Sequence, residues 1–321
     1  MGRYSLKISP PPLRGFLYYL RCKVRRMPLL VNLEVTKRCN AKCRFCAYWY
    51  EDPPDELPDY SEIIRKFRPV VAVITGGEPL LRDDCIEIIS GVKRYCHYTA
   101  MITNGALLTE DVAKRLSDAG LNQLSISLDY VDETHDKVRG LPGLFKHISA
   151  LVPQLTSTGY NIVINTVIMD SNLDHIIPLV HMASSWGAGI SLSSYCSLKR
   201  DNEEPLISGA SLNRLEKLVI ELKELKRSLG HIKNSDYYLD RIPIYFRTGR
   251  MPNCKAGKRW IQVTPDGKVK PCSELGPVCN WNEYLPHKAG EVECETCWYS
   301  CRGESEAKHL SPQRIRELLR M

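Results

Sequence analysis

Several features that would assign this sequence to a class at once are missing from it. Its 321 residues contain no apolar run long enough for a membrane-spanning helix, which needs about 18 residues. The N-terminus carries charges and Pro10, Pro11 and Pro12 where a secretory signal would have an apolar stretch. Neither G-x-G-x-x-G nor G-x-x-x-x-G-K-S/T, the common nucleotide-binding loops, occurs. We therefore expect a cytoplasmic protein.

Disulfides are not expected in that reducing compartment. The 13 cysteines are therefore better explained as metal ligands or catalytic thiols. Hydrophobic residues make up 43% of the chain and charged residues 25%, and these ordinary globular values exclude extended disorder and collagen-like structure.

Acidic residues are absent before Glu34, although seven basic residues precede it. These seven equal the whole net charge of +7, so the remainder of the chain is neutral. A nucleic-acid-binding protein normally carries its basic patch on the folded domain. We therefore expect no nucleic-acid partner.

Residues 13–27 have the periodicity of an amphipathic helix, with basic side chains mostly opposite an apolar stripe. The apolar members are Leu13, Phe16, Leu17, Leu20, Val24 and Met27. Two interpretations compete. The stripe packs beneath the folded domain, or the helix lies on an anionic membrane surface and gives the protein a peripheral location. In the second case the helix would deliver a lipid to the active site.

From residue 29 onward, short apolar β-branched runs alternate with amphipathic stretches. The six runs are 29–35, 70–75, 98–103, 123–128, 161–168 and 189–193. Apolar strands that alternate with helices indicate a parallel sheet covered by helices. Six such units are too few for a closed barrel of eight. We therefore predict an α/β fold, a partial (βα)6 barrel of TIM type with its active site at the C-terminal ends of the strands.

The composition divides the chain into three parts. We predict a basic N-terminal segment (1–28), a barrel (29–240) and a small cysteine-rich extension (241–321). Glycine and proline become frequent after Pro243, and six cysteines fall between Cys254 and Cys301. A final helix is predicted to begin at Ser311, its N-cap.

The most specific motif follows the first predicted strand and reads Cys39-Asn40-Ala41-Lys42-Cys43-Arg44-Phe45-Cys46. Its three thiolates converge on one metal centre if the loop wraps around it. A 4Fe–4S cube normally takes four cysteines, so three leave one iron open to another ligand. A structural zinc site is the alternative, although such sites usually combine paired C-x-x-C elements.

This motif, with Cys39, Cys43, Cys46 and the aromatic Phe45, resembles the signature of the radical S-adenosylmethionine (radical SAM) enzymes. The resemblance spans residues 29–195. It implies that SAM binds the open iron and is cleaved reductively to a 5′-deoxyadenosyl radical, which abstracts hydrogen from an unactivated carbon. It also implies a reductant protein of the ferredoxin or flavodoxin type.

Later strand ends fit the same resemblance. Thr75-Gly76-Gly77-Glu78-Pro79 is similar to the family's GGEP motif. Gly76 and Gly77 allow close backbone approach to a ligand, and Glu78 would accept hydrogen bonds from the SAM ammonium group. The resemblance implies further cofactor contacts, with Arg139 on the SAM carboxylate and Tyr48 near the adenine. The remaining members of this set are Asn104, Ser127 and Asp129. Each such polar residue would equally serve as a helix cap or face solvent.

The C-terminal cysteines form a second constellation. Cys254 and Cys272 flank a predicted hairpin with a Pro-Asp-Gly turn, and a hairpin brings its ends together. Cys294, Cys297 and Cys301 follow as C-x-x-C-x-x-x-C.

This segment, with Gly267 between Cys254 and Cys272, resembles the SPASM and twitch extensions of radical SAM enzymes. The chain offers six cysteines there, fewer than the full SPASM pattern. The resemblance therefore implies one auxiliary 4Fe–4S cluster, held by Cys254, Cys272 and two of the last three cysteines. A zinc ribbon is the alternative.

Tyr195 and Cys196 end the sixth predicted strand, beside the expected radical. Either would serve as a catalytic group that donates or relays a hydrogen atom. Packing between the barrel and the extension is the alternative role for both.

The sequence therefore predicts a radical SAM enzyme with one auxiliary cluster. A peptide or protein substrate matches what SPASM-bearing members commonly modify, although the 28 residues before the barrel are too few for a leader-peptide domain. The basic helix instead favours a lipid or isoprenoid substrate. A third interpretation is a non-catalytic iron–sulfur or zinc protein, such as an electron carrier, which would have no need of the GGEP-like residues.

Overall fold

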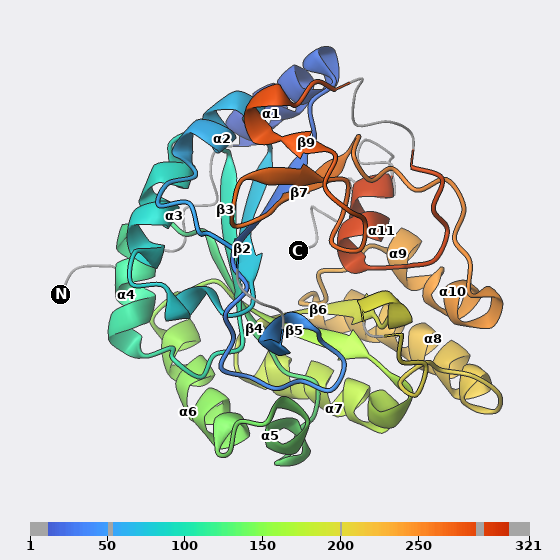
Figure 1. Ribbon diagram of the computed structural model, residues 1–321. Helices are drawn as coiled ribbons and strands as arrows, with labels where there is room; N and C mark the ends of the chain where they lie inside the picture. Colours follow the sequence, from blue (N-terminus) through green and yellow to red (C-terminus); the bar gives the residue numbers. More distant parts are fainter. Residues whose placement is uncertain (1–11, 51–53, 200, 287–291, 308–321) are drawn as a thin grey trace.

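The computed structural model describes residues 12–50, 54–199, 201–286 and 292–307 (Figure 1). The helix predicted from Ser311 lies outside these residues. No helix within these ranges is long and apolar enough to cross a membrane.

Six parallel strands form the body of the sheet and confirm the predicted partial barrel. They are β1 (Leu30–Thr36), β2 (Val71–Gly76), β3 (Tyr98–Thr103), β4 (Gln123–Ser127), β5 (Ile162–Ile168) and β6 (Gly189–Ser194). Each lies within one residue of its predicted run, and the strands are paired in chain order. The apolar, β-branched composition of the runs carried this prediction.

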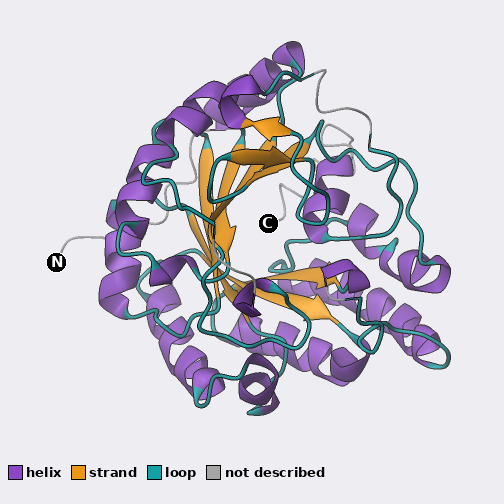
Figure 2. Cartoon of the chain, viewed as in Figure 1, coloured by secondary structure: helices purple, strands orange, loops and turns teal. Residues whose placement is uncertain are grey.

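Helices cover one side of the curved sheet, and the opposite, concave side faces the middle of the molecule (Figure 2). The covering helices are α2 (Ser61–Phe67), α3 (Cys85–Lys93), α4 (Glu110–Asp118), α5 (Thr134–Arg139), α6 (Leu144–Ser157) and α7 (Leu173–Ser185). The core lies between this layer and the sheet, where Leu33, Ile74 and Ile164 are buried among helix residues such as Ile88 and Leu151.

The concave side of the sheet carries many polar side chains. Side chains alternate between the two faces of a strand, so the neighbours of the core residues point away from the helices. These neighbours include Asn32, Glu34, Ser125, Ser127, Asn165, Ser191, Ser193 and Gln262. Apolar side chains such as Val73, Ala100 and Val163 lie among them. TIM barrels usually fill this space with bulky branched residues, whereas hydrogen-bonding groups share it here.

The C-terminal extension joins this sheet directly. Its strands are β7 (Trp260–Val263), β8 (Lys268–Lys270) and β9 (Cys279–Asn280). β7 pairs in parallel with β1, and β8 and β9 follow antiparallel, which gives nine strands in one sheet. The predicted hairpin is therefore confirmed. Four helices pack beyond β6 and beside the hairpin (Figure 1): α8 (Ser211–Leu229), α9 (Asp236–Leu239), α10 (Ile242–Thr248) and α11 (Ser300–Glu306).

The N-terminal helix α1 (Pro12–Arg25) packs at the N-terminal ends of the strands. Arg14 donates to the Cys96 carbonyl and Arg21 to the Phe67 carbonyl, just before β3 and β2 begin. The expectation that the apolar stripe packs beneath the barrel is wrong, because Leu17 and Leu20 are exposed. The helix packs through its other face, since Cys22 is buried and Gly15 lies against His97.

Candidate active site

The loop after β1 gathers Cys39, Cys43 and Cys46 at the C-terminal end of the sheet. Cys46 donates its backbone N–H to the Cys43 carbonyl at 3.2 Å, which curls the loop. Burial, together with the neighbouring thiols and Glu78, raises the pKa of the Cys39 thiol to about 11. Burial likewise raises the pKa of Cys43, which lies near Cys46. Buried thiols held near one another suit a soft metal cluster that takes them as thiolates.

Gly76 and Gly77 hold this loop against the end of β2. A Cβ on Gly76 would lie 2.2 Å from the Thr36 carbonyl oxygen, and one on Gly77 would lie 2.2 Å from that of Arg38. Gly77 and Glu78 donate their N–H groups to the same two carbonyls, each at 2.8 Å. The close approach that requires glycine is therefore to the backbone that leads into the cysteine loop.

Glu78 is fully buried between the ends of β2 and β3. Its carboxylate accepts hydrogen bonds from the Leu80 N–H at 3.1 Å, the Thr103 hydroxyl at 2.7 Å and the Asn104 N–H at 2.7 Å. Burial raises the pKa of this carboxyl, although those three hydrogen bonds act to lower it. A carboxylate can accept about four hydrogen bonds, so one site is left for a ligand such as an ammonium group.

Asn104 ties the end of β3 to the cysteine loop. Its side-chain amide donates to Oδ1 of Asn40 at 2.7 Å, and its own Oδ1 accepts from the Ala106 N–H at 2.9 Å. Asn40 lies inside the cysteine motif, directly after Cys39. The predicted cofactor residue Asn104 is thus in contact with the loop.

Asp129 and Arg139 form a buried ion pair at the end of β4, with 2.6 Å between Nη2 and Oδ2. Asp129 also accepts the Val167 N–H at 2.9 Å, and nearly buried Ser127 precedes it on the concave face. Although burial opposes a charge there, Asp129 and Cys43 hold the pKa of Arg139 above its ordinary value.

One donor of this guanidinium is open. Arg139 Nε is buried without a hydrogen-bond partner, and its Cζ lies 5.4 Å from the Phe45 ring centroid. Its backbone carbonyl accepts from Lys42 N at 2.8 Å. An unpartnered buried donor beside the cysteine loop fits an anionic ligand group such as the SAM carboxylate.

The aromatic residues predicted for the site lie around this loop. The half-buried ring of Tyr48 stacks under the Lys37 ammonium group at 4.5 Å. Phe45 packs against a small apolar cluster whose buried members are Tyr130, Met169 and Tyr195. Tyr195 is thus joined to the cysteine loop through this packing, and its hydroxyl donates to the Asn202 carbonyl at 2.8 Å.

Cys196 turns toward the extension. Its buried thiol lies 3.4 Å from the Thr296 carbonyl. Burial raises the pKa of this thiol, although hydrogen bonds with Tyr245 and Tyr299 act to lower it. β6 is therefore followed by two neighbouring side chains with different surroundings. Tyr195 packs within the barrel, and Cys196 lies against the extension.

The second constellation encloses a cavity. Five cysteines line it, together with Asn32, Trp260 and Arg302. The five are Cys254, Cys272, Cys294, Cys297 and Cys301. Cys279 is not among them, because it packs against the apolar core from β9. The hairpin and α11 bring together thiols that are up to 47 positions apart in the chain.

The thiols in this cavity influence one another unequally. Burial and the nearby Cys294 raise the pKa of both Cys254 and Cys272. Burial, Cys272 and Cys254 raise that of Cys301 to about 12. Cys297 lies near Cys196, Cys301 and Arg302, whose Nη1 is 3.9 Å from its sulfur. Cys294 and Cys301 thus each lie near both Cys254 and Cys272, whereas Cys297 adjoins Cys301.

Neither constellation has the compact geometry of a single-ion site. Across the described residues, no three or more His, Cys, Asp or Glu side chains are arranged to hold one metal ion. A 4Fe–4S cube instead takes its thiolates at separate irons. The donor sets, three thiols on the loop and four or five in the cavity, match the number of cysteines that such clusters use.

Two further sets of contacts, one made by Arg82 and one between Gln262 and Glu34, were not expected from the sequence. Buried Arg82 donates to the Val35 carbonyl at 2.8 Å and to the Leu57 carbonyl at 2.9 Å, which fixes the end of β1. On the concave face, Gln262 of β7 donates to buried Glu34 at 2.9 Å. The lone charge of Glu34 within an apolar run was the available signal for this second pair.

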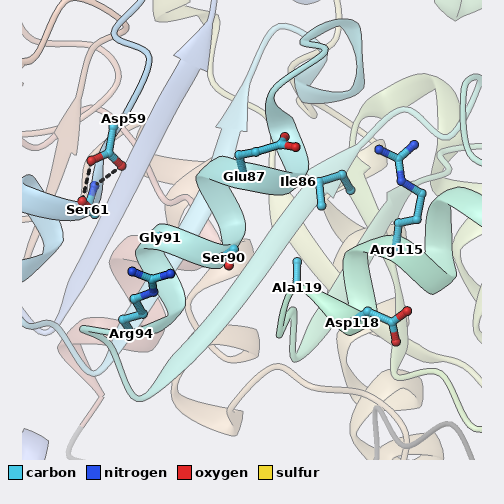
Figure 3. Close-up of a pocket in the computed structure, with 10 residues that line it drawn as sticks. All are labelled: Asp59, Ser61, Ile86, Glu87, Ser90, Gly91, Arg94, Arg115, Asp118 and Ala119. Atoms are coloured by element: carbon cyan, nitrogen blue, oxygen red, sulfur yellow. Dashed lines mark hydrogen bonds between the residues drawn. The ribbon is translucent and has the colours of Figure 1, made fainter.

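A separate groove lies on the helical outside of the barrel, between α3 and α4 (Figure 3). Charged side chains of both signs line it, among them Glu87, Arg94, Arg115 and Asp118. None of its lining residues belongs to the motifs described above. It therefore takes no part in the candidate site.

Part of the chain is similar to a known protein family. Residues 33–183 match the model described as "Radical SAM superfamily". The chain is 28% identical over 287 residues to the AdoMet-dependent heme synthase of Methanosarcina barkeri, covering 83% of this chain and 79% of the relative. It is 29% identical over 259 residues to a PqqA peptide cyclase of Methylocella silvestris, covering 76% and 68%.

The fold has a counterpart among solved structures. SuiB of Streptococcus suis, solved with S-adenosylmethionine bound, superposes with a TM-score of 0.67 at 16% identity. The match covers 86% of this chain and 69% of SuiB. This similarity supports the partial-barrel fold with its C-terminal extension.

Proposed function

Because the family match and the curated relatives support membership of the radical SAM superfamily, we propose that this chain cleaves SAM reductively at a 4Fe–4S cluster held by Cys39, Cys43 and Cys46. The observation that carries the proposal is the joint fixing of this loop by elements around it. Asn104, after β3, donates to Asn40 inside the loop, and the Arg139 carbonyl at the end of α5 accepts from the Lys42 N–H. Gly77 and Glu78, after β2, donate to Thr36 and Arg38, which lead into the loop. When bound, the cluster and SAM supply one-electron cleavage of the sulfonium bond, which yields methionine and a 5′-deoxyadenosyl radical that abstracts hydrogen from substrate.

The chain's own residues bind and orient SAM in this proposal. Arg139 Nε, buried and unpartnered, donates to the SAM carboxylate. The remaining acceptor site of Glu78 takes the ammonium group, and Ser127 and Asp129 line the approach from β4. Tyr48 lies at the end of the loop, where its ring provides an apolar face for the adenine.

We further propose one auxiliary 4Fe–4S cluster in the cysteine-lined cavity. Its ligands are Cys254, Cys272, Cys294 and Cys301, because Cys294 and Cys301 each lie near both hairpin thiols, whereas Cys297 lies near Cys301 and Cys196. Arg302 supports a cluster in this cavity, because its buried guanidinium lies near Cys254 and Cys297 and would offset the negative charge of a thiolate-ligated cluster.

A peptide or protein is the substrate class that the features favour. The polar side chains on the concave face, such as Asn32, Asn165 and Ser193, offer hydrogen bonds that a peptide can use and an isoprenoid chain cannot. One relative is named for its action on the PqqA peptide. Tyr195 and Cys196, at the end of β6, are the candidate groups for relaying a hydrogen atom. A cytoplasmic ferredoxin or flavodoxin would supply the electron.

The test is direct. The protein is reconstituted anaerobically with iron and sulfide, mixed with SAM and dithionite, and assayed for 5′-deoxyadenosine. We expect product from the wild-type chain and none from a variant with Ala at Cys39, Cys43 and Cys46. Absence of product from both would favour the electron-carrier alternative. Deuterated peptide extracts then test the substrate class, since a peptide substrate transfers deuterium to 5′-deoxyadenosine.

A further inference from the structure

The helix α1 presents its apolar stripe to solvent. Five large apolar side chains on this 14-residue helix are between 42% and 82% exposed: Leu13, Phe16, Leu17, Leu20 and Val24. Their spacing of three or four residues puts them on one side of the helix. A contiguous exposed apolar stripe of this kind marks an interaction surface rather than scattered surface residues.

The opposite side of α1 holds the helix on the barrel. Cys22, nine residues after Leu13 and so half a turn away from it around the helix, is buried, and its thiol lies 3.5 Å from the Arg68 carbonyl. Gly15 lets the helix approach closely, because a Cβ there would lie 2.7 Å from His97 Nε2. The barrel therefore fixes the helix with its apolar stripe pointing outward.

Positive charge flanks the stripe. The helix and its end carry five basic side chains, and no acidic residue precedes Glu34. The five are Arg14, Arg21, Lys23, Arg25 and Arg26. Arg68 of the barrel adds to the same field, since burial and the charges of Arg25 and Arg68 lower the pKa of Arg21. An apolar stripe bordered by cations is complementary to the surface of an anionic bilayer.

The attachment points of α1 define which end of the barrel would face such a surface. Arg14 and Arg21 bond to carbonyls directly before β3 and β2. These are the N-terminal ends of the strands, whereas the cysteine loop and Glu78 lie at the C-terminal ends. In Figure 1 the helix lies beside α2 at the edge of the molecule, away from the central loops.

We propose that α1 docks this protein on an anionic lipid bilayer, with the N-terminal end of the barrel toward the membrane and the cysteine loop toward water. The stripe enters the interface between headgroups and acyl chains, and the exposed basic side chains Lys23, Arg25 and Arg26 contact lipid phosphates. In this orientation the helix anchors the protein but does not deliver a lipid to the active site. The proposal is independent of the reaction.

Flotation with liposomes tests the anchor. Vesicles of phosphatidylcholine, with and without phosphatidylglycerol, are mixed with the full chain at low and high salt. We expect binding to the anionic vesicles at least about tenfold stronger than to the neutral ones at low salt, and weaker binding at high salt as the charges are screened. Equal binding to both vesicle types, or none, would overturn the proposal.

Matched variants identify the surface. Leu17→Glu and Leu20→Glu change exposed residues, so folding should survive while vesicle binding falls at least about tenfold. Ile220→Glu on α8 is the control, because Ile220 is 62% exposed and far from α1 in the chain. Unchanged binding of the α1 variants would refute the assignment.

Two other occupants of the stripe are distinguishable. A second copy would give a dimer in sedimentation that Leu17→Glu converts to monomer, without vesicle binding. A covering role for residues 1–11 would give vesicle binding only after their deletion. Either result rejects the membrane anchor.

The orientation has its own readout. Vesicle-bound protein should form 5′-deoxyadenosine at the rate of the free protein, since its cysteine end faces water. Loss of that activity on vesicles would reject the orientation. Loss of activity without vesicles would instead count against the proposed reaction, so the two failures are separable.

Discussion

The two cysteine sites differ in how the chain assembles them. The first uses eight consecutive residues, 39–46, and strand ends on either side hold it in place. The second draws its thiols from three segments, before the hairpin, after it, and at residues 294–301. A local motif can be recognised in sequence as a unit, whereas a site built by topology is recognised only as a set of spacings.

Their buried arginines differ in the same way. Arg139 at the first site leaves Nε without a partner. Arg302 at the second is fully buried, and its three nitrogens donate to the Cys297, Met251 and Pro252 carbonyls and to Glu306. The first site is therefore open to a ligand, and the second is closed by protein groups. This contrast fits a cluster that binds substrate and one that does not.

The largest effect is expected from removing the first thiol set. Replacing Cys39, Cys43 and Cys46 with Ala should abolish 5′-deoxyadenosine formation entirely, because only these thiols hold the SAM-binding cluster in the proposal. The auxiliary cluster's absorbance and iron should remain, since its ligands are on separate segments. Residual SAM cleavage in this variant would refute the assignment. Loss of all iron would show that the two sites do not assemble independently.

Removal of one thiol from the second site should have a smaller effect on SAM cleavage. Cys272→Ala should lose about half of the bound iron, the share of one of two clusters, while some SAM cleavage survives. Cys279→Ala is the matched control, because Cys279 lies on β9 outside the cavity. Iron analysis and visible absorbance measure both variants. Equal iron loss in the two would mean that the cavity is not the cluster site.

A methyl group on Gly77 should disturb the first site through its backbone. The added Cβ would lie 2.2 Å from the Arg38 carbonyl oxygen, and neither backbone can yield locally. We expect Gly77→Ala to lower stability by about 3 kcal/mol and to reduce iron in the first cluster. Gly276→Ala is the control, because nothing lies within 4 Å of its added Cβ. Thermal unfolding and iron analysis of both variants test this. Wild-type stability and iron content in Gly77→Ala would contradict the expectation.

Glu78→Gln tests whether the carboxylate binds SAM as well as holding the strand ends. Three donors point at this carboxylate. The glutamine amide would offer them a single oxygen, and its NH2 group would face the remaining donors. Loss of a charged hydrogen bond costs about 1.5–3 kcal/mol, so stability should fall by about 2 kcal/mol. SAM affinity should fall about tenfold, with iron content unchanged. A lower melting temperature with the same dissociation constant would leave Glu78 a purely structural role.

The sequence was sufficient to predict the strands and to single out the cysteine motif as a candidate site, because the required information is local. Apolar runs define β1 to β6, and the motif from Cys39 to Cys46 sits directly after the first run. The role of Gly76 and Gly77 was less predictable. Their close contact is with the backbone of residues 36–38, and no spacing in the sequence shows which chain passes beside a glycine.

Long-range pairing was beyond such reasoning. The parallel pairing of β7 with β1 joins residues more than 200 positions apart, and it brings Gln262 onto Glu34. The face by which α1 packs was also left open between two interpretations. Periodicity identified its apolar stripe correctly, but the side that meets the barrel depends on Gly15 and Cys22, whose small side chains allow close approach.

The smallest effect is expected from Cys297→Ala, which is compared with Cys301→Ala in the second site. Cys297 is buried beside Arg302, Cys196 and Cys301, whereas Cys294 and Cys301 each lie near both Cys254 and Cys272. Cys297→Ala should therefore keep both clusters and lower stability by only about 1 kcal/mol, the value of a small buried apolar group. Cys301→Ala, in the same segment, should lose the auxiliary cluster. Iron content, visible absorbance and melting temperature measured on the pair decide the ligand set. If Cys297→Ala lost the cluster and Cys301→Ala kept it, Cys297 would be the fourth ligand, and the C-x-x-C pair would hold the cluster together with the hairpin cysteines.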